Sequence, residues 1–341
     1  MICDAHVHFF SPGFFAGLNA SRDAVTALGF EFPASVEALA DRWVAELDAN
    51  GVARSALMAS LPGDADSVAE AVARHHSRFA GFFMLDPTRD DAIEYATRSL
   101  DAGLQTICLF PAMHRYPLHD DCVARVFELA DCYAARRAAT TSAAGASPTS
   151  KASPTREASP TPTDSSAEAL RAKVEGRRPV VFAHCGVLSV GVRKKLGLAS
   201  PFDLRFGNPL DLHGVALRFP AVPIVIPHFG AGLLREALMV ASLCPNVLLD
   251  TSSSNSWIKQ TPGLTLAQVF RTALDVVGPE RLLFGSDSSF FPRGWVRRVL
   301  DDQRAAMTAA GATGDQMALV TGGNLARLFP IDGPRRLPAH S

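Results

Sequence analysis

Short apolar runs alternate with amphipathic segments along most of the chain. The apolar runs have the length and the content of branched and aromatic side chains that are typical of buried strands. Eight of them predict strands, over residues 2–7, 55–59, 80–85, 106–110, 180–183, 224–227, 247–250 and 282–285. The segments between them have helical spacing, as in 35–50, where apolar residues recur at helical intervals and Gly51 supplies a stop. The pattern therefore predicts a succession of strand–helix units.

Eight such units favour a closed (β/α)₈ TIM barrel over an open sheet. An open doubly wound sheet more often carries a glycine-rich phosphate loop after its first strand, whereas a histidine and two phenylalanines occupy residues 8–10 here. We therefore predict an α/β protein in which residues 1–330 form a single barrel domain. Residues 331–341 are expected to form a C-terminal tail.

One segment, 138–167, interrupts the alternation. It consists largely of Ala, Ser, Thr and Pro and contains three Ser-Pro pairs, which disfavour regular structure. It lies between the fourth helix, expected to end near Arg137, and the fifth strand. We predict a disordered insertion on the N-terminal face of the barrel, the face remote from barrel active sites.

Composition narrows the class of protein and of partner. Hydrophobic residues make up 48% of the chain and charged residues 20%, which allows a large core. The formal net charge of -1 predicts a small-molecule substrate rather than nucleic acid or a membrane, and leaves a homodimer open. The six cysteines form no CxxC pair, the N-terminus lacks a signal-peptide pattern, and no apolar stretch reaches the ~20 residues of a membrane span. These features predict a cytoplasmic protein.

The first predicted strand carries the strongest chemical signal, the motif Asp4-x-His6-x-His8. Because strand side chains alternate between faces, His6 and His8 project to the same side. At the mouth of a barrel their neutral ring nitrogens are good ligands for a divalent cation. The alternative is a pair of hydrogen-bonded core histidines, but a chance match is expected only on the order of once in a hundred chains. The metal site is favoured, with Asp4 orienting it rather than binding the ion.

Polar side chains also follow three later strands. His184 follows the fifth, His228 the sixth, and Asp287 comes just after the eighth. A single histidine after an apolar run is more often structural than functional. Active sites of barrels, however, lie at the C-terminal ends of several strands, so these positions together predict one site.

The motif in the first strand, the strand-five histidine, the His-x-Gly at 228–230 and the Gly-Ser-Asp at 285–287 resemble the amidohydrolase superfamily. The ending at 323–329 is similar to that of its amidohydrolase-related branch, which includes aminocarboxymuconate semialdehyde decarboxylase and related metal-dependent hydrolases. The resemblance implies four metal ligands: His6, His8, His184 and Asp287. It also implies that His228 acts beside the bound water.

The number of metal ions follows from a departure from the binuclear members, which bridge two metals with a carboxylated lysine near the end of strand four. That region reads Ile-Cys-Leu-Phe over 107–110 and offers no lysine. We therefore expect one divalent cation, Zn²⁺ being the first choice. Cys108 is expected to pack rather than to ligate.

The resemblance implies a metal-dependent hydrolase, in which metal-bound hydroxide attacks a C–N or C–O bond of a small molecule. His228 and Asp287 are the expected catalytic residues that accept and return protons. The same residues would also suit a metal-dependent non-oxidative decarboxylase, a carboxy-lyase acting on a small carboxylic acid, and no motif separates the two. A barrel without catalysis is disfavoured because every expected ligand position is filled.

Loops on the catalytic face suggest what surrounds the site. Phenylalanines gather after the first strand, at positions 9, 10, 14, 15, 30 and 32. They favour an apolar or planar substrate, with the alternative that half of them only pack under the loop. Basic residues gather after the fifth strand, at positions 193, 194, 195 and 205. They either attract a carboxylate or form a solvated face. Asn255 and Trp257 are further candidate lining residues.

Overall fold

The structure, a computed structural model, describes residues 1–145 and 178–330. Its centre is one sheet of eight parallel strands paired in sequence order. The strands are β1 (Ile2–Phe9), β2 (Val52–Ala59), β3 (Phe79–Leu85), β4 (Thr106–Leu109), β5 (Val180–Ala183), β6 (Ile224–Ile226), β7 (Val247–Asp250) and β8 (Leu282–Leu283). Backbone hydrogen bonds from Ala5 to Phe284 and from His8 to Ser288 join the first strand to the segment after the last. The predicted barrel is confirmed.

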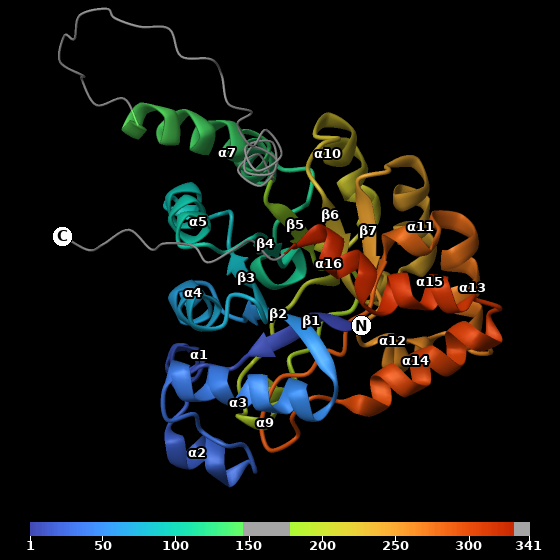
Figure 1. Ribbon diagram of the computed structural model, residues 1–341, viewed down its shortest axis with the longest axis horizontal. Helices are drawn as coiled ribbons and strands as arrows, with labels where there is room; N and C mark the ends of the chain where they lie inside the picture. Colours follow the sequence, from blue (N-terminus) through green and yellow to red (C-terminus); the bar gives the residue numbers. More distant parts are fainter. Residues whose placement is uncertain (146–177, 331–341) are drawn as a thin grey trace, which may run out of the picture.

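Helices surround the strands (Figure 1). The α-helices are α1 (Pro12–Gly17), α2 (Arg22–Ala27), α3 (Val36–Ala49), α4 (Ala65–Arg74), α5 (Ala92–Asp101), α6 (Pro111–His114), α7 (Asp121–Gly145), α9 (Gly191–Lys195), α10 (His213–Arg218), α11 (Leu234–Leu243), α12 (Ser254–Trp257), α13 (Leu266–Val277), α14 (Arg297–Ala309), α15 (Gly314–Ala318) and α16 (Asn324–Leu328). The 3-10 helices are η1 (Leu204–Phe206), η2 (Pro209–Leu212), η3 (Pro227–Gly230), η4 (Ile258–Gln260) and η5 (Pro279–Arg281), and η6 (Leu319–Gly323) is a π-helix. Within residues 1–145 and 178–330, no helix has both the length and the apolar character needed to cross a bilayer.

Alternation along the strands divides the buried side chains between two layers. In β2, Leu57 packs in an outer cluster shared with the helices, whereas Met58 belongs to an inner cluster built mainly from the strands. Leu325 and Phe329, in and just after α16, also join the inner cluster and fill one end of the barrel. The Arg54 guanidinium donates a hydrogen bond to the carbonyl oxygen of Phe329 and fixes this closure.

The predicted boundary between helix and insertion is partly wrong. Helix α7 does not end near Arg137 but continues to Gly145, so residues 138–145 are helical rather than disordered. Alanine has the highest helix propensity, and no proline lies between Arg137 and Pro148, so no residue in 138–145 stops the helix. The remainder of the predicted insertion, 146–167, and the predicted tail, 331–341, lie outside the described residues.

The loops after β5 and β6 meet where Gly186 approaches the backbone of Gly230 and Ala231. Gly186 has a φ of +75°, and a Cβ atom there would lie 2.1 Å from the Gly230 carbonyl oxygen. We expect Gly186→Ala to lower the free energy of unfolding by about 3 kcal/mol, as measured by urea denaturation. Gly197→Ala is the control, because Gly197 also has a positive φ, +67°, but no atom lies within 4 Å of its Cβ position. Equal losses in both variants would show that the close contact contributes nothing.

Candidate active site

A cavity of about 540 Å³ opens among the loops that follow the carboxyl ends of the strands. Its lining includes all five residues predicted to form the site: His6, His8, His184, His228 and Asp287. The structure thus brings together side chains that lie far apart in the sequence.

A register shift in β1 directs its two histidines into the cavity. Ala5 packs in the inner cluster and Val7 in the outer one, although strict alternation would place both on the same face. The pairing with β2 shifts between Asp4 and Val7, which accounts for the change of face. His6 and His8 therefore line the cavity on the inner side. Alternation alone predicted that they share a face, but not which face.

Asp287 lies opposite the ring nitrogens of these two histidines. Its Oδ1 is 3.1 Å from His8 Nε2 and 3.9 Å from His6 Nε2. Asp287 has a φ of +58°, and its backbone N–H donates to the carbonyl oxygen of His6 at 3.0 Å, so the turn is tied to β1. Desolvation opposes ionisation of Asp287, but the hydrogen bond from His8 and the nearby imidazoles hold its pKa well below the usual range.

His184 and His228 complete the ring of polar groups. The ring centres of His184 and His228 are 5.1 Å apart, and those of His228 and His6 are 5.0 Å apart. His228 has a φ of +57°, a left-handed conformation that is strained for a histidine and that occurs at functional sites. Burial, followed by the charges of neighbouring histidines, lowers the pKa of both His184 and His228, so both rings are neutral at pH 7.

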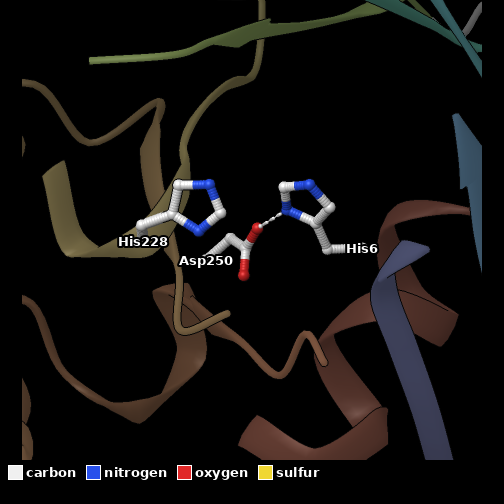
Figure 2. Close-up of side chains that lie close together, drawn as sticks. All are labelled: His6, His228 and Asp250. Carbon is white, nitrogen blue, oxygen red and sulfur yellow. Dashed lines mark hydrogen bonds and ion pairs between the residues drawn. The ribbon is translucent and has the colours of Figure 1, made fainter. Parts of the chain in front are cut away.

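The hydrogen bonds of the rings determine which nitrogens remain for a ligand. The Nδ1 of His6 pairs with Asp250 Oδ2 at 2.6 Å (Figure 2), and the Nδ1 of His8 pairs with Ser60 Oγ at 2.7 Å. Each therefore directs its Nε2 toward Asp287 Oδ1, the position from which it can bind a cation. His184 Nδ1 is buried and has no hydrogen-bond partner among the described residues. A buried ring nitrogen without a partner is costly unless something binds it, so these residues fit a metal ion.

Within the described part of the chain, two groups of side chains are close enough to hold an ion, and both include His6: one with His228 and Asp250, the other with His8 and Asp287. In the first, Asp250 Oδ2 already bonds to His6 Nδ1, as Figure 2 shows, and Asp250 does not line the cavity. In the second, every member lines the cavity. The second group is therefore the better place for a metal, and Asp250 orients His6.

The sequence did not suggest the carboxylate and the hydroxyl that contact the Nδ1 atoms of the site histidines, those of Asp250 and Ser252. Asp250 ends β7 and is completely buried, and the Ser252 hydroxyl lies 2.9 Å from the Nδ1 atoms of both His6 and His228. The polar triplet at 250–252, which begins at the last residue of an apolar strand, was the available signal.

Asp4 orients the site, as predicted. Its carboxylate accepts hydrogen bonds from Trp295 Nε1 at 2.6 Å and from the backbone N–H groups of His6 and Ser286. Burial raises the pKa of Asp4 to about 6. Cys108 packs in the inner cluster and does not line the cavity.

The predicted loop residues divide into lining and non-lining groups. Among the described residues, those that line the cavity are Phe10, Phe14, Phe30, Lys195 and Trp257. The other loop candidates do not: Phe9, Phe15, Phe32, Arg193, Lys194, Arg205 and Asn255. Arg205, for example, forms an ion pair with Asp203, as expected of a solvated charge. Arg293, which the sequence did not suggest, also lines the cavity.

Replacing Asp250 by asparagine is expected to weaken metal binding about tenfold, because His6 loses the carboxylate that orients its ring and raises its basicity. The dissociation constant for zinc, measured by competition with a chelating dye, reports the change. Asp64→Asn is the control, since Asp64 is also a buried carboxylate but bonds to Ser11 and Ser67 instead of a histidine. Equal zinc affinities in the Asp250 variant and the wild type would remove Asp250 from the metal centre.

A family model described as "Amidohydrolase" matches residues 3–331. The chain belongs to the amidohydrolase family. The resemblance inferred from the strand-end motifs is thereby confirmed, and the protein is an amidohydrolase-family enzyme. Among curated proteins, protein fluG of Emericella nidulans is 30% identical over 90 residues, which are 26% of this chain and 10% of that protein.

Solved structures share the barrel at low sequence identity. An amidohydrolase from Burkholderia multivorans with bound zinc is 16% identical, with a TM-score of 0.57 over 97% of this chain and 100% of that one. A probable 2-pyrone-4,6-dicarboxylic acid hydrolase from Acinetobacter baumannii is 13% identical, with a TM-score of 0.53 over 96% and 98%. A 5-carboxyvanillate decarboxylase from Novosphingobium aromaticivorans, with bound manganese, is 14% identical, with a TM-score of 0.55 over 96% and 97%. This amidohydrolase fold thus accommodates both reaction types.

Proposed function

We propose that this amidohydrolase-family enzyme is a metal-dependent hydrolase that cleaves a C–N or C–O bond of a small molecule. The observation that carries the proposal is the orientation of His228. Its Nδ1 lies 2.9 Å from the carbonyl oxygen of Ser252, and a carbonyl can only accept, so the proton of the neutral ring is on Nδ1. The Nε2 lone pair is then free to act as a base beside the cavity.

The proposed ligands of a single divalent cation, with Zn²⁺ the first choice, are His6, His8, His184 and Asp287. Three imidazoles and one carboxylate suit zinc, and a cation bound there supplies a Lewis acid that polarises a substrate carbonyl and acidifies a water. His228 accepts a proton at Nε2 and holds it beside the reacting carbon. The Asp287 carboxylate, partly open to the cavity, then receives this proton and passes it to the leaving group.

Decarboxylation is the second candidate, supported by the similarity to the 5-carboxyvanillate decarboxylase. That reaction requires a group that delivers a proton to a substrate carbon. If His228 is that group, it must carry a proton on Nε2 in the resting enzyme, whereas its neutral ring keeps the proton on Nδ1 for the Ser252 carbonyl. The geometry therefore favours hydrolysis.

A substrate screen tests the proposal. Lactones, amides and aromatic or enoic acids would be incubated with the full chain while proton release and carbon dioxide are recorded together. We expect a lactone or an amide to release protons without carbon dioxide, and we expect zinc to restore activity after chelation. Carbon dioxide released from an acid, with no turnover of lactones or amides, would overturn the hydrolase in favour of the decarboxylase.

A further inference from the structure

We propose that Lys195 and Arg293 form an anion-binding subsite in the cavity wall. Its ligand would be the carboxylate of a small planar acid, a carboxylate distinct from the group that reacts. The inference deepens the proposed function, on which it rests for the identity of the reacting site, by naming the substrate class. Its evidence lies in the charges and rings at the cavity wall.

Two loops bring the two cations to the same aromatic ring. Lys195 ends α9, which follows β5, and Arg293 lies in the loop after β8. Lys195 Nζ is 5.5 Å from the ring centre of Phe290, and Arg293 Cζ is 4.7 Å from that centre. The separation of the two cations therefore cannot exceed the sum of these distances. Both side chains line the cavity, so a single small acid can reach either one.

Neither cation has a counter-ion in the described part of the chain. The structure shows no carboxylate within ion-pair distance of Lys195 or Arg293 there, whereas Arg205 pairs with Asp203. Arg293 donates to Ser289 Oγ at 2.9 Å and to the Asp287 carbonyl oxygen at 3.3 Å, which are both uncharged acceptors. Of the described residues that line the cavity, Asp287 is the only acid; its carboxylate attracts Arg293 from beyond ion-pair distance and would be neutralised by a bound cation. The wall thus carries two positive charges that a carboxylate would neutralise.

The rings beside these cations suit a planar ligand. Phe10 and Phe14 stack at 4.0 Å with an interplanar angle of 5°, and both line the cavity. The ring centres of Phe30 and Phe290 are 4.0 Å apart, and Lys195 Nζ is 4.6 Å from the ring centre of Phe30. Cation–π contacts with Phe30 and Phe290 help to position the Lys195 and Arg293 side chains, but each such contact is worth only about 0.5–1 kcal/mol at an exposed site. Because these contacts are weak, the positive charges of Lys195 and Arg293 remain available to bind a carboxylate.

The test compares two ligands that differ in one charge. Isophthalate carries two carboxylates, and 3-carbamoylbenzoate has a neutral amide in place of one of them. Both ligands keep one carboxylate, so its attraction to a metal cancels in the ratio of the two affinities. We expect calorimetry on the zinc-loaded full chain to show at least tenfold tighter binding of isophthalate. This preference should disappear in the double variant Lys195→Gln/Arg293→Gln.

The matched control is Lys194→Gln/Arg298→Gln, because both residues are exposed and neither lines the cavity. It should keep the preference. The single variants Lys195→Gln and Arg293→Gln should each lose part of it, and they serve as the test if the double variant does not fold. Equal affinity of the wild type for the two ligands, binding of neither, or an unchanged preference in the variants would overturn the subsite.

Repeating the titration after chelation separates this inference from the proposed function. A preference that persists without metal and still depends on Lys195 and Arg293 supports a subsite independent of the cation. If the protein binds no metal but keeps this preference, the hydrolase proposal fails and the subsite stands. If the protein binds metal and hydrolyses a neutral ester without any preference for the diacid, only the subsite fails.

Discussion

Replacing Asp287 by asparagine is expected to lower kcat/KM about a thousandfold, the largest effect among single substitutions of the site. The asparagine keeps the size of the side chain but cannot accept a proton at neutral pH, and it is a weaker metal ligand. The turn at residue 287 has a φ of +58°, which asparagine tolerates better than alanine does, so the fold should survive. Initial rates on a substrate from the hydrolysis screen provide the measurement.

The control for this substitution is Asp302→Asn, since Asp302 is an exposed carboxylate on α14 that pairs with Arg298. It should leave kcat/KM unchanged. Metal content must be measured on both variants, because a loss of activity with metal retained assigns Asp287 to proton transfer, and a loss of both assigns it to ligation. Near-normal activity in the Asp287 variant would remove this residue from the mechanism.

Replacing His184 by alanine is expected to weaken zinc binding by about 3 kcal/mol, or about a hundredfold in Kd, as one of four ligands is lost. The reason is that His184 lines the cavity and that its buried Nδ1 has no hydrogen-bond partner among the described residues. Competition with a chelating dye measures the affinity.

His114→Ala is the matched control for His184. The Nδ1 of His114 is also buried without a hydrogen-bond partner in the described part of the chain, but His114 does not line the cavity. Its replacement should affect stability and leave zinc affinity unchanged. If both variants bind zinc as the wild type does, His184 is a packing residue and the proposed set of ligands is wrong.

The positions of the strands and of their polar ends could be predicted because both depend on local pattern. Apolar runs bounded by polar residues gave all eight strands, and the histidines at 184 and 228 stand directly after two of them. In a closed barrel the ends of parallel strands share one face, so residues far apart in the sequence meet without further information. For this reason all five predicted site residues line one cavity.

The features that sequence reasoning missed depend on contacts between strands. The register shift between Asp4 and Val7, which turns His6 and His8 inward, is visible only when β1 is paired with β2. In the sequence, Asp250 cannot be told from any other acid at the end of a strand. Only the closed barrel shows that its Oδ2 lies 2.6 Å from His6 Nδ1. Arg293 lies in an irregular loop after β8, where no periodicity indicates which way a side chain points.

The fold alone leaves the reaction open, because barrels with TM-scores of 0.53 and 0.55 include a probable hydrolase and a decarboxylase. Groups that move protons distinguish such enzymes better than their architecture does. In this chain the hydrogen bond of His228 to the Ser252 carbonyl is the feature that favours a base over an acid. The acceptor is a backbone carbonyl oxygen, which no side-chain substitution removes, so the substrate screen is the more direct approach.

The proposed mechanism requires that His6, His8, His184 and Asp287 hold a metal ion. Its most direct test is the metal content of the full chain, purified without chelators and analysed by inductively coupled plasma mass spectrometry, beside the double variant His6→Ala/His8→Ala. We predict a single divalent cation per chain in the wild type and none in the variant. A wild-type protein that contains no such ion and takes up none when zinc or manganese is supplied would contradict the account.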